Sequence, residues 1–246
     1  MKTSKIEWTE ATWNPSIGCN KVTAGCKFCY AEVMAKRLKA MGNKDYNQGF
    51  KFKTLPNRLN MPLTITKPTK FFVNSMSDLF HEKMPYTFLN QVFETIRLTP
   101  HHHYQILTKR ENILNDYFKK NIVPQNVWLG VTVEMQKTKN RIDVLREIPA
   151  NIRFLSLEPL LEDLGELNLN GIHWVIVGGE SGPNARPMKP AWVENIKKQC
   201  LAQNVKFFFK QWGTWGSDGK RRSKKANGRI FLGEEWNEEP TINYNP

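Results

Sequence analysis

Six short apolar runs, separated by segments with the spacing of helices, constrain the fold of this chain more than any other feature. The runs are rich in β-branched and aromatic residues and cover residues 70–74, 104–108, 127–133, 153–157, 174–177 and 205–209. Crossover helices are expected over residues 85–98, 110–119, 135–147 and 190–202. Runs that are apolar throughout indicate strands buried on both faces, as in a parallel sheet. The sequence therefore predicts an α/β fold of six or seven βα units.

Three of the four cysteines lie close together, in the spacing C-x6-C-x2-C formed by Cys19, Cys26 and Cys29. Thiolates at this spacing can reach one metal centre, and three ligands leave one iron of a cubane cluster, or one position of a zinc ion, open for another ligand. Two alternatives stay open. The trio can belong to a structural zinc site completed by Cys200 or a histidine, or it can be three unrelated buried thiols.

The residues after Cys29 have the pattern of an amphipathic helix. Apolar side chains recur at Tyr30, Val33, Met34, Leu38 and Met41, and Gly42 is a typical residue just beyond a helix end. We expect the cysteine loop to lead directly into this helix.

Charge and hydropathy favour a polyanionic partner and exclude a membrane span. The 246 residues include 36 Lys and Arg against 23 Asp and Glu, which gives a net charge of +13. Such an excess favours nucleic acid, although it also serves simple solubility. No run of 18 apolar residues and no apolar leader segment occurs, so we expect no membrane association. A cytoplasmic location is expected, because a reducing compartment keeps thiols available as metal ligands.

Polar residues follow the predicted strands at the points where the strands end. Carboxyl ends of parallel strands meet at one rim, which is where parallel barrels build their active sites. The residues concerned are Asn74, Ser75, Ser77 and Asp78; Thr108, Lys109 and Arg110; Thr132 and Glu134; Ser156 and Glu158; and Gly178, Gly179, Glu180 and Ser181. Asp78, Ser156 and Ser181 have an alternative interpretation as helix N-caps.

Several motifs together resemble the phage-type three-cysteine family, which is functionally uncharacterised and similar to radical S-adenosylmethionine enzymes. The motifs are Cys19 with Cys26-Lys27-Phe28-Cys29, Gln105-Ile106-Leu107-Thr108-Lys109-Arg110, Leu157-Glu158-Pro159-Leu160, Val175-Ile176-Val177-Gly178-Gly179-Glu180-Ser181-Gly182 and Lys210-Gln211-Trp212-Gly213. The resemblance covers residues 5 to 240. It implies a partial (βα)6-type parallel barrel of the radical S-adenosylmethionine type over residues 1–210, with residues 211–246 as a basic, Trp-containing extension packed on the barrel.

The resemblance also implies a site. Cys19, Cys26 and Cys29 would ligate a [4Fe–4S] cluster whose open iron binds S-adenosylmethionine. The implied cofactor contacts are Phe28, Tyr30, Ser75, Asp78, Thr132, Glu134, Gly178, Gly179 and Glu180. The sequence departs from the common pattern in its six-residue first gap and in the late position of the glycine pair, which has a tight turn as its alternative. The implied reaction begins with a 5′-deoxyadenosyl radical, with Glu158, Lys109 and Arg186 as candidate catalytic residues or, alternatively, as salt-bridged rim residues.

Aromatic and cationic residues alternate near the end of the chain, which is typical of a nucleic-acid contact because bases stack on aromatic rings and phosphates attract cations. The candidate residues are Trp212, Trp215, Lys220, Arg221, Arg222, Lys224 and Lys225. The alternative is a solvated basic loop beside core tryptophans. The tract His101-His102-His103 is interpreted as a polar loop.

Taken together, these features favour a radical S-adenosylmethionine enzyme that acts on nucleic acid or a nucleotide, in repair or modification, and that draws on an external electron donor. Two other classes remain open. One is a zinc-binding, non-catalytic nucleic-acid module, and the other is a phage-derived barrel protein that acts as the partner of another protein.

Overall fold

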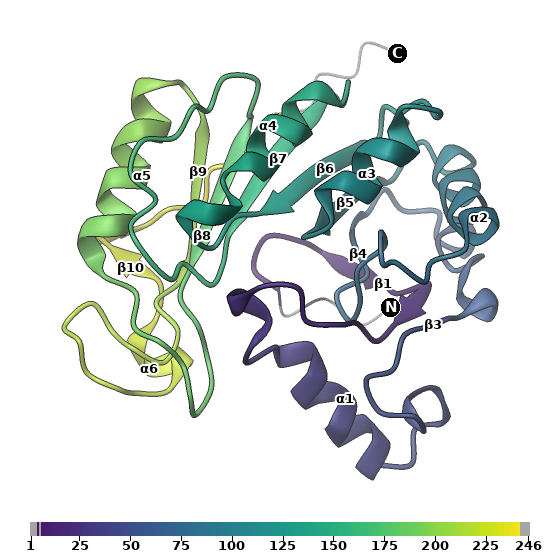
Figure 1. Cartoon of the computed structure of the whole chain (residues 1–246), viewed down its shortest axis with the longest axis horizontal. Helices are drawn as coiled ribbons and strands as arrows, with labels where there is room; N and C mark the ends of the chain where they lie inside the picture. Colours follow the sequence, from purple (N-terminus) through teal and green to yellow (C-terminus); the bar gives the residue numbers. More distant parts are fainter. Residues whose placement is uncertain (1–3, 5, 242–246) are drawn as a thin grey trace. The chain divides into compact units, whose positions relative to one another are not determined.

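The structure, a computed structural model, describes residue 4 and residues 6–241 and forms two compact units (Figure 1). The first unit comprises Met1–Gly130 and Glu147–Asn151, and the second comprises Val131–Arg146 and Ile152–Pro246. The predicted extension over residues 211–246 lies within the second unit, apart from residues 242–246, which lie outside the described residues. Its boundary at residue 210 stays a prediction.

The first unit is built on parallel strands. Its ladder runs in the order β1 (Ala11–Trp13), β4 (Lys70–Val73) and β5 (His103–Thr108). Strand β6 (Val127–Thr132) comes next in the order and continues into the second unit. Strands β2 (Ser16–Ile17) and β3 (Lys53–Thr54), which lie between β1 and β4 in the chain, form a separate antiparallel pair. Every residue of β6 is buried, as a strand covered on both faces requires.

Helices connect the strands of the first unit, as the apolar spacing predicts. The α-helices are α1 (Tyr30–Ala40), α2 (Tyr86–Arg97) and α3 (Glu111–Phe118), and the 3-10 turns are η1 (Ala24–Cys26), η2 (Lys44–Tyr46), η3 (Pro56–Arg58) and η4 (Pro62–Thr64). Helix α2 buries Phe88, Leu89, Val92, Phe93 and Ile96 on one stripe. Three-four spacing of this kind places one face of a helix on the core.

The second unit repeats the same pattern. Its parallel ladder runs β7 (Ile152–Leu157), β8 (Trp174–Gly178) and β9 (Lys206–Gln211). The other elements are η5 (Gln136–Thr138), α4 (Asn140–Glu147), α5 (Pro190–Ala202), α6 (Lys224–Asn227) and the short pair β10 (Ile230–Phe231) and β11 (Glu234–Glu235). The five residues of β8 are all buried.

The predicted α/β class with parallel strands and helical crossovers is confirmed. All six predicted strands are present to within two residues at each end, and four of the five predicted helices start and end within one or two residues of their predicted limits. Over the described residues the strand order has two ends, β1 and β9, as a partial barrel requires. Strand β1 and the two-residue strands β2, β3, β10 and β11 were not predicted, and the predicted helix over 135–147 is divided into η5 and α4. Among the described residues, no helix has both the length and the apolarity needed to cross a bilayer.

Gly18 combines a left-handed backbone with a lack of room for any side chain. A methyl group there would lie 2.2 Å from the Lys51 carbonyl oxygen, whereas one on Gly42 would meet nothing within 4 Å. The two residues have nearly equal φ values, +77° and +75°, so the left-handed penalty is the same for both. We therefore expect Gly18→Ala to lower the free energy of unfolding by about 1–3 kcal/mol more than Gly42→Ala.

Urea denaturation followed by circular dichroism measures this difference. Equal losses in the two variants would show that the loop before Cys19 can move away from Lys51.

Candidate functional site

The three cysteines lie on a loop with a defined backbone. The Cys19 amide donates to the Phe50 carbonyl at 3.1 Å, and the Cys26 amide donates to the Thr23 carbonyl at 3.0 Å. Cys29 is the N-cap residue of α1, so the predicted continuation from loop to helix is confirmed. All three thiols are free and partly buried. Partial burial leaves them accessible to a ligand or an ion.

Hydrogen bonds fasten the cysteine loop to the segment that follows β4. The Gly18 amide donates to the Met76 carbonyl at 3.0 Å, and the Ser77 hydroxyl donates to the Gly18 carbonyl at 2.7 Å. The Asn74 side chain accepts from the Ser16 amide at 3.2 Å. The loop is thereby held at the carboxyl end of β4.

Asp78 and Arg110 form the buried charged centre of this rim. Arg110 Nη1 and Asp78 Oδ2 are 2.9 Å apart, and both side chains are more than nine-tenths buried. The Asp78 carboxylate also accepts from the Thr108 hydroxyl and from the amides of Phe80 and Lys109, at 2.7, 3.0 and 3.1 Å. A buried carboxyl group needs partners such as these, because a buried polar group without hydrogen bonds is costly. Asp78 therefore organises the rim and caps no helix.

Arg110 connects the charged centre to the cysteine loop. Its guanidinium donates to the Asn20 carbonyl at 3.3 Å and to Glu82 at 3.0 Å, and it hydrogen-bonds to Cys19. Sequence reasoning named Arg110 as a rim residue and not as a site residue. The available signal was a cation directly after a strand whose neighbours, Thr108 and Lys109, are also polar.

Burial and nearby charges shift the pKa values of Cys19 and Cys26 in opposite directions. Burial raises the pKa of Cys19 to about 11, although the Arg110 charge opposes the rise. Burial alone would also raise the pKa of Cys26, but the Lys109 charge and hydrogen bonds from Val22 and Thr23 outweigh it, so the Cys26 pKa is lowered. Cations close to thiols favour the thiolate, which is the form that binds metals. The charge of Lys109 thus lowers the pKa of Cys26, an interaction that the sequence did not predict.

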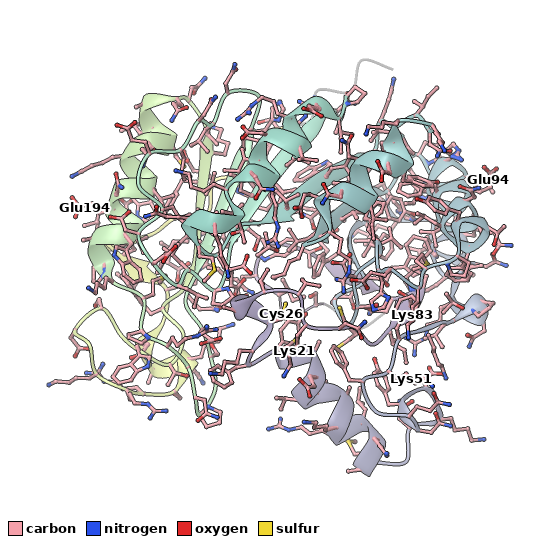
Figure 2. All side chains as sticks on the ribbon, in the orientation of Figure 1. Lys21, Cys26, Lys51, Lys83, Glu94 and Glu194 are labelled. Atoms are coloured by element: carbon pink, nitrogen blue, oxygen red, sulfur yellow. The ribbon has the colours of Figure 1, made fainter. Side chains whose placement is uncertain are left out.

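The loop fits a metal centre in the chemistry of its donors. Figure 2 shows Cys26 near the start of α1, close to Lys21. Among the residues that the structure describes, however, no three His, Cys, Asp or Glu side chains are arranged to hold an ion. Three partly exposed cysteine thiols are suitable ligands for a metal ion or an iron–sulfur cluster. That all three thiols converge on one such group stays a prediction.

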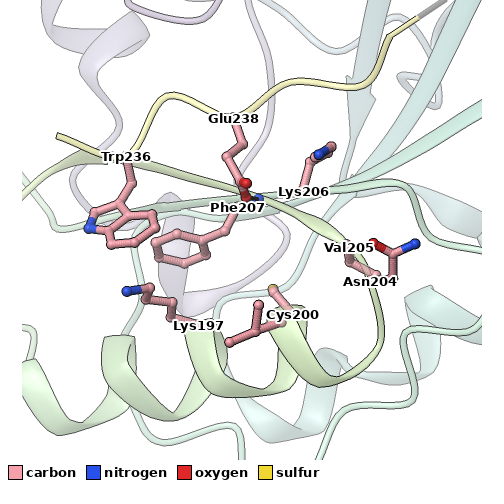
Figure 3. Close-up of a pocket in the computed structure, with 9 residues that line it drawn as sticks. Lys197, Cys200, Asn204, Val205, Lys206, Phe207, Trp236 and Glu238 are labelled. Carbon is pink, nitrogen blue, oxygen red and sulfur yellow. Dashed lines mark hydrogen bonds between the residues drawn. The ribbon is translucent and has the colours of Figure 1, made fainter.

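Cys200 has different surroundings. It is fully buried on α5, and burial raises its pKa to about 12. It lines a small pocket of the second unit together with Lys197, Leu201, Asn204, Val205, Lys206, Phe207, Trp236 and Glu238 (Figure 3). The Lys197 ammonium lies 3.3 Å from the centre of the Trp236 ring. Cys200 thus differs from the three partly buried cysteines in being closed to solvent, and buried thiols of this kind are chemically inert.

The other cofactor candidates of the first unit lie around the loop. The Tyr30 hydroxyl donates to the Ser75 carbonyl, and the Ser75 hydroxyl lies 3.1 Å from Asn14 Oδ1. Phe28 is partly buried, and the Lys27 ammonium lies 5.4 Å from its ring centre. Tyr30 is 59% exposed. Phe28, Tyr30 and Ser75 therefore border the cysteine loop, with surface that a ligand can reach.

In the second unit, Glu134 and Thr132 share one buried cation. Arg141 Nη1 donates to Glu134 Oε2 at 3.0 Å and to the Thr132 carbonyl at 2.7 Å. Glu134 is fully buried. A buried carboxylate requires such a partner, because moving a charged group out of water is costly.

Glu158 forms a polar cluster with the end of β9 in the second unit. Its carboxylate accepts from the Lys210 ammonium at 2.8 and 2.9 Å and from the Gln211 amide at 2.9 Å. A Cβ on Gly178 would lie 3.1 Å from the Glu158 carboxyl carbon, so glycine gives this side chain its space. Sequence reasoning quoted Lys210 and Gln211 in a motif but did not name them as site residues. Their pairing with Glu158 spans more than 50 positions in the chain.

A close backbone approach and an ion pair occur side by side after β8, at Gly179 and between Glu180 and Arg186. A Cβ on Gly179 would lie 1.9 Å from the Trp212 carbonyl oxygen, so the backbones approach closely there. Arg186 donates to both Glu180 oxygens, at 2.7 and 2.9 Å. These contacts agree with the tight-turn interpretation of the glycine pair and with the salt-bridged interpretation of Arg186. Ser156 lies inside β7 and no helix begins at Ser181, so neither caps a helix.

The basic C-terminal candidates divide into two groups. Trp212 is 3% exposed, its ring packs on Phe209 and Phe231, and its indole donates to the Ile230 carbonyl at 2.8 Å. The interpretation of Trp212 as a base-stacking surface is therefore corrected to a core residue.

The second group remains on the surface. Trp215 is partly buried and has the Arg221 guanidinium 5.3 Å from its ring, and Arg222 pairs with Asp218 at 2.6 Å. Lys220, Lys224 and Lys225 are exposed. In the first unit, His102 is buried and His103 begins β5, so only His101 fits the predicted polar loop.

Comparison with known proteins identifies a family and a set of similar folds. The family described as "Protein of unknown function (DUF5131)" matches residues 3–240. No curated protein matches the chain. The expectation of an uncharacterised family that covers nearly the whole chain agrees with this match.

Solved structures of spore photoproduct lyase are similar to the chain at low identity. The enzyme complexed with dinucleoside spore photoproduct is 11% identical with a TM-score of 0.45, over 80% of this chain and 62% of that chain. A single mutant of the enzyme is 13% identical with a TM-score of 0.48, over 83% of this chain and 64% of that chain. A double mutant with bound AdoMet and dinucleoside spore photoproduct is 12% identical with a TM-score of 0.44, over 80% and 62%. The chain thus spans less than two thirds of the length of these structures.

In the metal-free protein, we expect iodoacetamide to modify Cys26 faster than Cys19 at about pH 8, because the thiolate is the reactive form and Cys26 loses its proton at lower pH. Lys109→Gln should slow the reaction of Cys26, since it removes the cation that lowers the pKa. Lys120→Gln, an exposed lysine after α3, is the matched control. Cys200 should react only after unfolding.

Mass spectrometry of tryptic peptides follows each thiol separately, because Lys21 and Lys27 divide the three cysteines among three peptides. A Cys19 rate equal to or above that of Cys26 would contradict the electrostatic assignment.

Proposed function

We propose that the chain, which belongs to the DUF5131 family of proteins of unknown function, is a radical S-adenosylmethionine enzyme acting on nucleic acid or a nucleotide. One observation carries this proposal. Three partly buried thiols stand on a loop that is bonded to the carboxyl end of a parallel strand and that leads into a helix. Three thiol ligands suit a cubane cluster with one open iron.

Cys19, Cys26 and Cys29 would hold a [4Fe–4S] cluster, and Lys109 and Arg110 would offset the negative charge of the thiolates. Bound together, the cluster and S-adenosylmethionine supply a 5′-deoxyadenosyl radical. The protein's own contribution is to bind, orient and exclude water. The Arg110 contacts to Asn20, Asp78 and Glu82 support this role, since they hold the loop in one conformation.

Phe28, Tyr30 and Ser75 are the proposed cofactor contacts of the first unit, because their side chains border the loop and retain accessible surface. Asp78 is proposed to act through Arg110 and Lys109. In the second unit, Thr132 is proposed to contact the cofactor through its hydroxyl group, because Arg141 engages its carbonyl, and Gly178 and Gly179 are proposed to give space through their lack of side chains. Glu134 and Glu180 are engaged with Arg141 and Arg186, so we propose that they position the rim.

Glu158, with Lys210, is the proposed orienting pair for the substrate. Both side chains are only partly buried, at 21% and 15% exposure, and a carboxylate with two close donors has a defined orientation. Lys109 is proposed as an additional cation that orients the substrate, and Arg186 as the salt-bridge partner that fixes the Glu180 side chain.

Nucleic acid or a nucleotide is the proposed substrate class because of the exposed cations between Lys220 and Lys225, with Trp215 beside them. Phosphates favour such a cluster, and ring faces favour bases. A reducing cytoplasm is the proposed location, since it keeps the three thiols available.

Anaerobic reconstitution with iron and sulfide should give brown protein with about four irons per chain. Cys19→Ala, Cys26→Ala and Cys29→Ala should each abolish the cluster. Cys200→Ala is the matched control and should retain it, because Cys200 is buried on α5. Iron and sulfide analysis with visible absorption provides the measurement.

Stoichiometric zinc in place of iron would favour a non-catalytic zinc module. An intact cluster that yields no 5′-deoxyadenosine from S-adenosylmethionine under strong reductant would contradict the enzymatic proposal.

The basic segment allows a separate test. Binding of a labelled single-stranded oligonucleotide should weaken with salt, and Lys224→Gln with Lys225→Gln should reduce the slope of log K against log salt by up to about 1.4, or about 0.7 per lost contact. Lys119→Gln with Lys120→Gln is the matched control, since it removes another adjacent pair of exposed lysines. Fluorescence anisotropy from about 50 to 200 mM salt measures the slopes. Equal slopes in both double variants would mean that the segment is a solvated surface.

A further inference from the structure

A bulge at the end of β9 turns two consecutive side chains toward one carboxylate. The register between β8 and β9 shifts after Val177, and Gly178 pairs with Gln211, so that Lys210 is an extra residue in β9. Neighbouring residues of a regular strand point to opposite faces of the sheet. Lys210 and Gln211 nevertheless both bond to Glu158. Bulges that redirect a side chain in this way are common next to active sites.

This cluster has hydrogen-bonding capacity for a further group. Among the described residues, Glu158 Oε1 accepts from Lys210 and Gln211, whereas Glu158 Oε2 accepts from Lys210 alone. The Gln211 amide has a fixed orientation, since its Nε2 also donates to the Gly179 carbonyl at 3.2 Å. Its Oε1 is buried and accepts no hydrogen bond from any residue that the structure describes. An unpaired buried acceptor is costly, which indicates that the cluster is built to bind another donor.

The charges of the cluster favour a neutral ligand over a phosphate. The Glu158 carboxylate and the Lys210 ammonium are 2.8 Å apart and balance each other. A phosphate that approached the ammonium would also be repelled by the carboxylate. A neutral group with an N–H beside an acceptor avoids this conflict, because its N–H meets the carboxylate and its acceptor meets the ammonium. Nucleobases have this pattern on their edges, where acidic side chains accept from base N–H groups and lysine donates to base acceptors.

We propose that Glu158 and Lys210 bind the edge of an unpaired nucleobase, with Gln211 as the positioning residue that orients the carboxylate. This inference rests on the function proposed above and names the part of the substrate that the pair orients. Both side chains are mostly buried, at 21% and 15% exposure, so a base reaches them only when it is outside a duplex stack. The exposed cations between Lys220 and Lys225 remain the proposed contacts of the phosphates.

Two labelled single-stranded probes of equal length separate the bases from the phosphates. One is an oligonucleotide of mixed sequence, and the other carries the same phosphates on abasic tetrahydrofuran units. Glu158→Gln is the test variant. Glu194→Gln is the matched control, because Glu194 pairs with Lys198 at 2.9 Å on α5 (Figure 2) and its loss changes the net charge equally. Fluorescence anisotropy with the reconstituted protein gives the dissociation constants, while iron analysis verifies the cluster and circular dichroism verifies the fold.

We expect Glu158→Gln to bind the base-containing probe about tenfold more weakly than Glu194→Gln, and the two variants to bind the abasic probe equally. Glu158→Gln with Lys210→Gln keeps the net charge of the unaltered protein and leaves no lysine unpaired, and it should show the same loss.

Equal binding of the base-containing probe by Glu158→Gln and Glu194→Gln would overturn the proposal, as would an equal loss on both probes or tighter binding by Glu158→Gln. Each of these results leaves the rest of the proposed function in place. Failure of the unaltered protein to bind either probe would overturn base recognition together with nucleic acid as the substrate.

Discussion

The buried ion pair between Arg110 and Asp78 is the interaction on which the candidate site depends. Asp78 follows β4 and Arg110 follows β5, and the pair is more than nine-tenths buried. Removal of one partner of such a pair typically costs about 3–5 kcal/mol, because the other charge is left buried without compensation. Arg110 also bonds to Asn20 and Cys19, so the same interaction that satisfies Asp78 holds the cysteine loop.

Acidic residues after the strands of the second unit are likewise each paired with a cation. Glu134 is paired with Arg141, Glu158 with Lys210, and Glu180 with Arg186. The degree of burial distinguishes their roles. Glu134 is fully enclosed and holds structure, whereas Glu158 and Lys210 retain some exposure and can meet a ligand. A rim of this kind is rigid, because each charge has its orientation set by a partner.

Burial on both faces explains why the main strands could be predicted. Segments such as Trp174–Gly178 must be apolar at every position, and no alternation is needed to recognise them. Strand β1 lacks this signal, since Ala11–Trp13 has three residues and a threonine in its centre. The helix boundary at Tyr30 was predictable from the apolar spacing that starts there.

By itself, the sequence determined the alternation of strands and helices, the grouping of three thiols and the excess of positive charge, because these depend on residue type and on neighbours along the chain. Only the tertiary structure decided which charges are paired and which rings are covered. Trp212 illustrates the difference: beside a basic segment it has the sequence pattern of a stacking residue, but Phe209 and Phe231 bury it. Lys210 likewise meets Glu158 only because β7 and β9 both pair with β8, with a shift in the β8–β9 register between Val177 and Gly178. Contacts between residues far apart in the chain depend on that register, which no local pattern contains.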